Sequence, residues 1–518
     1  MDFFLNVKKH IHSCRKLVYL VTTTIIIIYL VGFWFLKLGE LPGLHGDEAW
    51  FGLQAIDYSQ NGIHSLCGMT NYTGILQSSL SWLTFNLWNY GVQQLRVGGV
   101  ILNIIGLLIL FYTFYSIREL KGGLFFVLLM AQSIFYCVYP KIAWEVTSFN
   151  LLFISILIHA ALKIWCHDGD NKRFWAGVFL LVNIVGSYNH ILFSCLAIAG
   201  LTGTLLWGTV TKNSDLGKYL PILFLNVINV TLLHFLMVYC FGYIYIDNWT
   251  FFVLIAVVFT LITLESCFYQ KLKFTALTRL RSKYVRKLVP VMLLAGLTLF
   301  VMIHGVSFFL VMTNYTPLIR FFSFETPPAQ KIIYCANAGV LCAILLFFLV
   351  KDFLKSSLIP YLFVAYVGIF NVYTINPYDR YYLSLYVLIW FYLAYKLSRS
   401  TLLSSPVLIS TLIVIIINTS IFTNIFTDLN RPLRPVEYSI GLDKKEKSGH
   451  FISVKPLVTV LRKNGISNIK YLSQQYFIQT PIEFYRNCEP WPVFSLDTLA
   501  VDYDYFHLGK GFTYQVIK

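Results

Sequence analysis

The feature that most constrains the fold is a series of long apolar runs, separated by short polar segments. Thirteen such runs lie between residues 17 and 425, and each is about long enough to cross a bilayer as a helix. Within lipid, only helices and closed barrels satisfy their own backbone hydrogen bonds. We therefore predict a mainly α, polytopic membrane protein. The predicted spans are 17–38, 95–117, 122–139, 146–165, 174–189, 190–211, 219–245, 249–269, 288–311, 331–350, 357–375, 381–397 and 405–425.

Composition supports a membrane protein, because 57% of the residues are hydrophobic and only 12% are charged. A soluble domain carries about twice that charge. The first run, from Leu17 to Leu36, has no small-residue cleavage site after it. It is therefore read as a retained helix and not as a cleaved signal peptide.

The formal net charge of +16 does not indicate nucleic-acid binding, because the basic residues fall in blocks between apolar runs. With a cytoplasmic N-terminus, the segments assigned to the inside hold 22 Lys and Arg residues, against 6 outside. This asymmetry predicts that orientation. An odd number of spans then places the C-terminus outside. The absence of an endoplasmic-reticulum retention signal favours a bacterial inner membrane and its periplasm over a eukaryotic lumen.

The composition changes after about residue 427. Residues 428–518 are richer in charge and are broken by Pro and Gly. They contain one helical pattern, Val454–Lys463, and short β-type runs at Asn468–Leu472 and Phe512–Ile517. We predict two domains: a transmembrane domain at 1–427, which includes an outer loop at 39–94, and a small periplasmic α/β domain at 428–518.

Two adjacent acids, Asp47 and Glu48, follow the first span at the predicted start of a helix. Acids are favoured there by the helix dipole and as caps. On a helical wheel, Asp47 shares a face with Gln54 and Tyr58, opposite an apolar face that includes Ile56. We therefore predict a short helix in the membrane interface, with the Asp47 carboxylate facing water.

Other unusual residues gather on the same predicted side of the membrane: Lys141, Glu145, His190, Arg380 and Tyr381. Taken singly, Lys141 and Arg380 could snorkel to headgroups, and the tyrosines could form an aromatic belt. Together, carboxylates and cations on one aqueous face indicate a reaction centre. A carboxylate can take a proton from a hydroxyl, and Arg or Lys can neutralise a phosphate leaving group.

The motifs around these residues resemble those of the C-type membrane glycosyltransferases. The most similar branch contains the protein O-mannosyltransferases and the lipid A aminoarabinose transferase. The resemblance covers about residues 17–425. The matching motifs are Gly46-Asp47-Glu48-Ala49-Trp50, Asn61-Gly62, Tyr72-Thr73-Gly74, Gln94-Leu95-Arg96, Ala143-Trp144-Glu145 and Asp379-Arg380-Tyr381-Tyr382-Leu383.

The resemblance implies transfer of a sugar from a polyprenyl-phosphate donor, with inversion, to a lipid, glycan or protein acceptor. Asp47 would be the general base. Glu48 and Glu145 would hold the acceptor, the sugar or a divalent metal cation. Arg380 would bind the donor phosphate, with help from Lys141 and Tyr381. No cofactor other than that cation is implied, and no nucleic-acid partner.

Two departures from the family pattern matter. The Lys-Pro-Pro segment of the aminoarabinose branch is absent, since Thr73–Leu76 stands in that region, which argues against that sugar. Lys141 stands where an arginine is expected, which removes bidentate phosphate binding.

Two other classes share these membrane features. A transporter or flippase of lipid-linked sugars should show inverted repeats and broken helices, and no internal repeat is visible in the sequence. A lipid-linked polymerase or ligase would feature a large late outer loop, and Thr313–Gln330 is too short for one.

Overall fold

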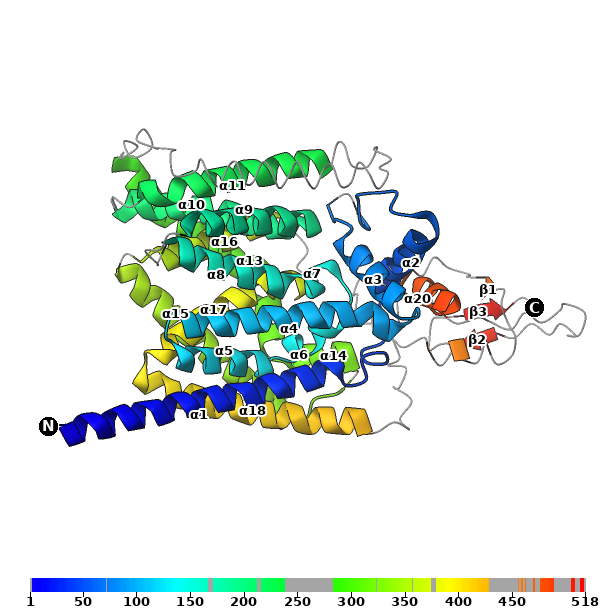
Figure 1. Ribbon diagram of the computed structural model, residues 1–518, viewed down its shortest axis with the longest axis horizontal. Coiled ribbons are helices and arrows are strands. Elements are labelled where there is room, and N and C mark those ends of the chain that lie inside the picture. Colours follow the sequence, from blue (N-terminus) through cyan, green and yellow to red (C-terminus); the bar gives the residue numbers. More distant parts are fainter. Residues whose placement is uncertain are drawn as a thin grey trace, which may run out of the picture.

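The computed structural model is a bundle of long helices with a cluster of short helices and strands at one end (Figure 1). It describes residues 2–70, 72–165, 171–211, 216–237, 283–322, 324–355, 357–373 and 379–427. In the C-terminal part it describes Lys455, 458–459, Arg462, 469–470, 476–488, 505–507 and 513–516.

The described helices follow one another as α1 (Asp2–Phe35), α2 (Gly46–Asn61), α3 (Leu76–Leu87), α4 (Val92–Ser116), α5 (Leu120–Gln132), α6 (Ile134–Val138), η1 (Tyr139–Lys141), α7 (Glu145–Ser148), α8 (Asn150–Trp165), α9 (Lys172–Asn189), η2 (Ile191–Phe193), α10 (Ser194–Thr211), α11 (Leu216–Leu236), α13 (Lys283–Met312), α14 (Tyr315–Phe322), α15 (Pro328–Leu354), α16 (Leu358–Tyr373), η6 (Asp379–Tyr382), α17 (Leu383–Ser398), α18 (Thr401–Thr427) and α20 (Tyr476–Cys488).

A helix lies over twelve of the thirteen predicted spans, and the remaining one, 249–269, lies outside the described residues. Within the described ranges, five helices are long and apolar enough to cross a membrane, or seven if each of two bent pairs counts as one span. Exposed apolar side chains cover the flank of the bundle, as on α1 and α15. The protein is therefore mostly helical with several apolar helices, as a polytopic membrane protein is. The count of thirteen spans stays a prediction.

The predicted span 122–139 is not one straight helix, because the helix breaks at Ser133. The axes of α5 and of 134–141 meet at 82°. The break frees backbone groups, and amide side chains from later helices pair with them. Asn314 accepts from the backbone N–H of Ile134 (3.1 Å) and donates to the carbonyl of Gln132 (3.0 Å). Asn418 of α18 donates to that carbonyl too (2.7 Å). Irregular backbone at membrane depth is tolerated where protein satisfies it.

The second bent pair, α13 with α14, was not predicted. It turns through 74° between Leu297–Met312 and Tyr315–Phe322. Asn314, which pairs with the first break, lies in the short turn of the second, so the two bent elements hold each other in place.

Helix α2 is enclosed by protein more than an interfacial helix would be. Tyr58, which shares a face with Asp47 on the helical wheel, is 3% exposed, and Asp47 and Gln54 are half-buried. The helix packs against α3 and α20, and its apolar face, with Ala49 and Ile56, belongs to a separate small core. The face that carries Asp47 is therefore mostly enclosed by protein, and the position of the helix in the membrane interface stays a prediction.

Part of the predicted β structure after residue 427 is present. Strands β1 (Ile469–Lys470), β2 (Tyr505–His507) and β3 (Thr513–Val516) form an antiparallel sheet in the order β1-β3-β2. Most of the predicted helix Val454–Lys463 lies outside the described residues, whereas α20 is additional. The elements α2, α3, α7, α20 and this sheet gather at the same end of the bundle (Figure 1).

Candidate active site

The start of α2 separates the two adjacent acids. His45 caps the helix: its Nδ1 accepts from the backbone N–H of Asp47 (2.9 Å), and its own N–H donates to Glu48 Oε2 (3.0 Å). This is a capping box in which histidine replaces serine. Because consecutive helical residues point about 100° apart, Glu48 turns into the protein while Asp47 keeps 15% of its side-chain surface exposed.

Glu48 is completely buried and forms a two-pronged ion pair with Arg96 of α4. Arg96 Nε donates to Oε1 and Nη2 to Oε2, each at 2.8 Å, and neither side chain is exposed. The backbone N–H of Ala143 adds another donor to Oε1 (2.8 Å). Together with the hydrogen bond from the backbone N–H of His45, the Glu48 carboxylate accepts four hydrogen bonds.

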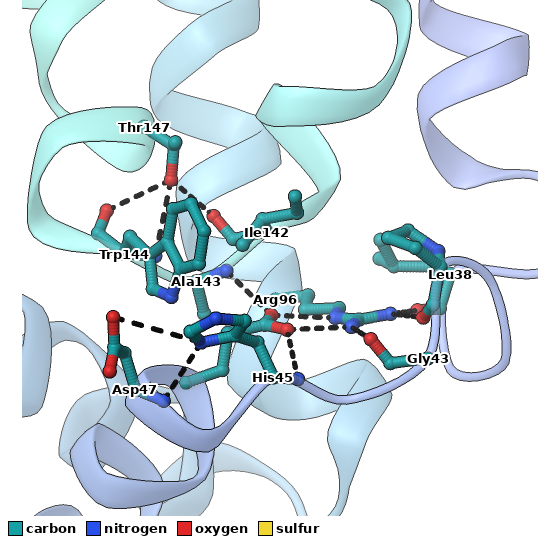
Figure 2. A network of polar contacts seen from close by, with 11 residues as sticks. Leu38, Gly43, His45, Asp47, Arg96, Ile142, Ala143, Trp144 and Thr147 are labelled. Carbon is teal, nitrogen blue, oxygen red and sulfur yellow. Dashed lines mark hydrogen bonds and ion pairs between the residues drawn. The ribbon is translucent and has the colours of Figure 1, made fainter. Parts of the chain in front are cut away.

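Arg96 is equally saturated. Its Nη1 donates to the carbonyls of Leu38 and Pro42 (2.9 Å each), and its Nη2 donates to that of Gly43 (3.2 Å). Figure 2 shows Arg96 lying between Gly43 and Leu38 on one side and the start of α2 on the other. Arg96 therefore ties the chain after the first span to α4. The sequence marked Arg96 as part of a motif but gave it no role.

Asp47 meets Arg380, which lies 333 residues later in η6. Arg380 Nη1 donates to Asp47 Oδ2 at 3.0 Å. The two side chains keep 20% and 15% of their surfaces exposed, respectively. This pair therefore has one direct hydrogen bond and access to solvent, whereas the Glu48–Arg96 pair has two direct hydrogen bonds and no exposed surface. The structure thus brings together the two residues that the sequence predicted to share a site.

Aromatic rings hold the Arg380 guanidinium. Its Cζ lies 4.6 Å from the Trp144 ring centroid and 5.5 Å from that of Tyr381, within the range of cation–π attraction. Trp144 itself packs edge-on against His45 at 4.6 Å. These rings leave the guanidinium beside Asp47 in a defined orientation.

Glu145 and His190 form the other side of the site. Glu145 Oε1 lies 3.9 Å from His190 Nε2, and Asn189 donates to the Glu145 backbone carbonyl (2.7 Å). The His190 ring lies 5.7 Å from the rings of both Tyr72 and Tyr381. The outer loop thus closes over the junction of α9 and η2. The sequence had placed His190 on this face without a role, and Asn189 was missed because an amide beside a turn carries no distinctive signal.

Burial shifts the acid–base properties of this group. It raises the pKa of Asp47 above its usual value, against the opposing pull of Arg380. It raises the pKa of Glu145 to about 7, again against Arg380, and lowers the pKa of His190 to about 3. Burial also disfavours the charged Arg380, but Asp47, Tyr381 and Glu145 together outweigh it and hold the Arg380 pKa above its usual value. His190 is therefore neutral near pH 7, and Glu145 titrates there.

Lys141 does not have the environment predicted for a phosphate ligand. Its side chain is fully buried, and Nζ donates to the carbonyl of Leu36. The same Nζ lies 5.3 Å from the ring centroids of Phe33 and Phe426. It is therefore directed toward α1 and α18.

The predicted metal ligands do not fit a metal ion. The four donors on Glu48 leave its oxygens no capacity to coordinate a cation, so it cannot pair with Glu145 around one. In the part of the chain that the structure describes, no group of three His, Cys, Asp or Glu side chains could hold a metal.

Two small pockets lie behind the site and not at it. One is lined by residues at the helix break, including Gln132 and Asn314. The other is lined by Thr147, Asn150 and Leu383, next to α7 and η6.

No family model matches the chain, and no curated protein matches its sequence. Among solved structures, the apo form of ArnT from Cupriavidus metallidurans is similar, with 14% identity, a TM-score of 0.35, and coverage of 72% of this chain and 76% of that one. The archaeal oligosaccharyltransferase AglB from Archaeoglobus fulgidus gives 13% identity and a TM-score of 0.45, covering 96% and 62%. Because the TM-scores lie below 0.5, we infer nothing about activity from them.

Proposed function

We propose that this chain is an inverting membrane glycosyltransferase that transfers a sugar from a polyprenyl-phosphate donor to an acceptor hydroxyl at the outer face of a bacterial inner membrane. The observation that carries the proposal is the solvent-accessible pair of Asp47 and Arg380, at the end of a helical bundle. A base and a phosphate-binding cation are the two groups that such a transfer requires.

In the proposed step, the acceptor oxygen attacks the anomeric carbon from the face opposite the phosphate. The carbon–oxygen bond to phosphate breaks, and its electron pair stays on the phosphate oxygen. Asp47 takes the hydroxyl proton. The products are the glycosylated acceptor and polyprenyl phosphate. A lipid phosphate is a good leaving group, so no nucleotide is needed.

The neighbouring residues receive matching roles. Arg380, held over Trp144 and beside Tyr381, would neutralise the leaving phosphate once donor binding draws it from Asp47. The pairing with Arg380 favours the ionised, basic form of Asp47, against the effect of burial. Glu145 would hydrogen-bond a hydroxyl of the sugar or acceptor. For Glu48 we propose a positioning role in place of catalysis or metal binding, and no step uses a metal.

This proposal keeps the domain division made from the sequence. Residues 1–427 form the transmembrane domain, with thirteen spans, a cytoplasmic N-terminus and a catalytic outer loop at 39–94. Residues 428–518 form a small periplasmic domain. The acceptor class, a lipid, a glycan or a protein, is left open.

The test is sugar transfer by purified protein in liposomes, supplied with polyprenyl-phosphate sugars and with lipid, glycan and peptide acceptors. Asp47→Asn should lower turnover by roughly 10²–10⁴-fold. Asp57→Asn is a matched control, because Asp57 lies on the same helix but pairs with His64 at 3.4 Å, away from the site. Near-normal turnover in Asp47→Asn would remove the base assignment.

Arg380→Ala should weaken donor use, with Arg399→Ala as its control. Arg399 pairs with Glu119 at 2.7 Å, between α17 and the start of α5, and has no part in the site. An equal loss of donor use in both variants would mean that the positive charge of the protein affects donor use and that the position of Arg380 in the site does not.

One observation favours the transporter as a second candidate. Broken helices with polar partners are typical of transporters, and the breaks after Gln132 and Met312 meet at Asn314. Movement of a lipid-linked sugar across liposomes without any transfer would favour this reading.

A further inference from the structure

The C-terminal helix α20 packs directly on the back of α2. Phe484 of α20 is completely buried. A Cβ atom at Gly52 would lie only 2.3 Å from Phe484 Cε2 and 2.7 Å from Cδ2. Real Cβ atoms do not approach other atoms so closely, so the contact requires glycine at position 52. A second contact, between Lys455 Nζ and Glu40 Oε1 at 3.6 Å, joins the same two parts of the chain at the surface.

The core around Phe484 reaches the residues that hold Glu48. Phe484 belongs to one apolar cluster with Leu44, Ala49, Leu95 and Ala143. Ala143 donates its N–H to Glu48, and Leu44 precedes the His45 cap. Leu95 precedes Arg96. Three of the segments around the buried ion pair, those at Leu44, Leu95 and Ala143, thus contribute to the cluster that Phe484 fills, whereas Leu38 packs in the main core.

This packing has an electrostatic consequence. A buried ion pair keeps its strength only while water is excluded and while its two partners keep a fixed geometry. Tyr485, the neighbour of Phe484, is half-buried near Arg96 and Glu48, and burial raises its pKa to about 12. Helix α20 therefore covers one side of the ion pair.

The same packing fixes the rotation of α2 about its axis. A carboxylate about 6 Å from the axis moves by about 2 Å when the helix turns by about 20°. That displacement exceeds the tolerance of the 3.0 Å hydrogen bond between Asp47 and Arg380. Gly52 lies five residues after Asp47, so contact at Gly52 controls the orientation of Asp47.

We propose that Phe484 is a positioning residue: by filling the cleft over Gly52, it holds α2 in the rotation that directs Asp47 toward Arg380. The C-terminal segment would then be part of the catalytic machinery, although it supplies no reacting group. The activity part of this inference rests on the proposed function, and the structural part does not.

The first experiment needs no activity. Hydrogen–deuterium exchange of the full-length protein in detergent compares wild type with Gly52→Ala, Phe484→Leu and the double variant. Gly52→Ala should speed exchange in both 46–52 and 476–488, and the double variant should return both toward wild type. Gly339→Ala is the control, because a Cβ there meets nothing within 4 Å, and its exchange in these segments should not change.

The second experiment measures transfer. Gly52→Ala should lower kcat roughly tenfold or more with less than about a twofold change in donor KM, because donor contacts at Arg380 are not touched. Phe484→Leu should restore most of the loss. If Gly52→Ala does not fold, Phe484→Leu alone should still lower kcat and speed exchange in 46–52.

The outcomes separate the two proposals. Unchanged exchange in 476–488 on Gly52→Ala, or no rescue by Phe484→Leu, overturns the positioning role, whatever the activity. Rescue of exchange, combined with no transfer by wild type, supports the contact and overturns the proposed function. Equal changes in kcat and KM would assign Phe484 to general stability and also overturn the inference.

Discussion

Two acid–arginine pairs start from adjacent residues and differ in every other respect. Glu48 and Arg96 are fully buried and share two 2.8 Å hydrogen bonds, with all remaining capacity used by backbone groups. Asp47 and Arg380 share one 3.0 Å bond and stay in reach of solvent. The first pair is closed to any ligand. The second keeps surface that a ligand could reach.

The comparison shows how one loop can hold a closed, rigid ion pair beside a carboxylate that stays within reach of solvent. The closed pair fixes the loop, the helix start and α4 together, so the neighbouring carboxylate needs no further bonds to hold its place. Predictions that alter the two pairs separately should therefore give opposite patterns of stability and activity.

The largest effect is expected from Glu48→Gln. Removing one charge of a buried pair leaves Arg96 uncompensated, which costs about 3–5 kcal/mol. Asp47→Asn, at a partly exposed pair with one direct hydrogen bond, should cost less, about 1–3 kcal/mol. Melting temperatures in detergent measure both. A smaller loss in Glu48→Gln than in Asp47→Asn would reverse the comparison.

Glu145→Gln should change stability in a pH-dependent way. Because the folded pKa of Glu145 is raised to about 7 from 4.5, its protonated form stabilises the fold below pH 4.5, and that contribution is lost as the pH rises through 7. The variant stays neutral, so it should be more stable than wild type at pH 8, by up to about 3 kcal/mol, and equal to it near pH 4. A constant difference in melting temperature from pH 4 to 8 would contradict the raised pKa.

Arg380→Lys tests whether the open pair acts through shape as well as charge. Lysine keeps the charge but loses the planar fork that can grip a phosphate and stack on Trp144. We expect donor KM to rise about tenfold, with melting temperature little changed. An unchanged KM would mean that a point charge suffices at this position.

The smallest effect should come from Lys141→Met. Its ammonium is engaged with the Leu36 carbonyl and two rings, so donor KM should stay within about twofold of wild type. Transfer assays beside Arg380→Lys supply the measurement. A loss as large as that of Arg380→Lys would restore the phosphate role predicted from the sequence.

The sequence was sufficient to predict the helical class, the helix start at Asp47 and Glu48, and the common side of Asp47, Glu145 and Arg380. Local periodicity and charge placement encode these features. It could not predict which acid would be buried, because that depends on Arg96, a partner 48 residues away that no local pattern connects to Glu48. The break at Ser133 was missed for the same reason. In the sequence, the apolar run 122–139 looks like one continuous span. The amide side chains that pair with the backbone groups freed by the break come from distant helices.

The helix break also has a consequence for how the chain assembles in the membrane. The carbonyl of Gln132 and the N–H of Ile134 emerge from the ribosome long before Asn314, and Asn418 on α18 comes later still. Until those amides arrive, the early half of the bundle holds unsatisfied polar backbone in lipid. Insertion of α18 should therefore stabilise α5 and α6, and a truncated chain that lacks α18 should be degraded by membrane quality control.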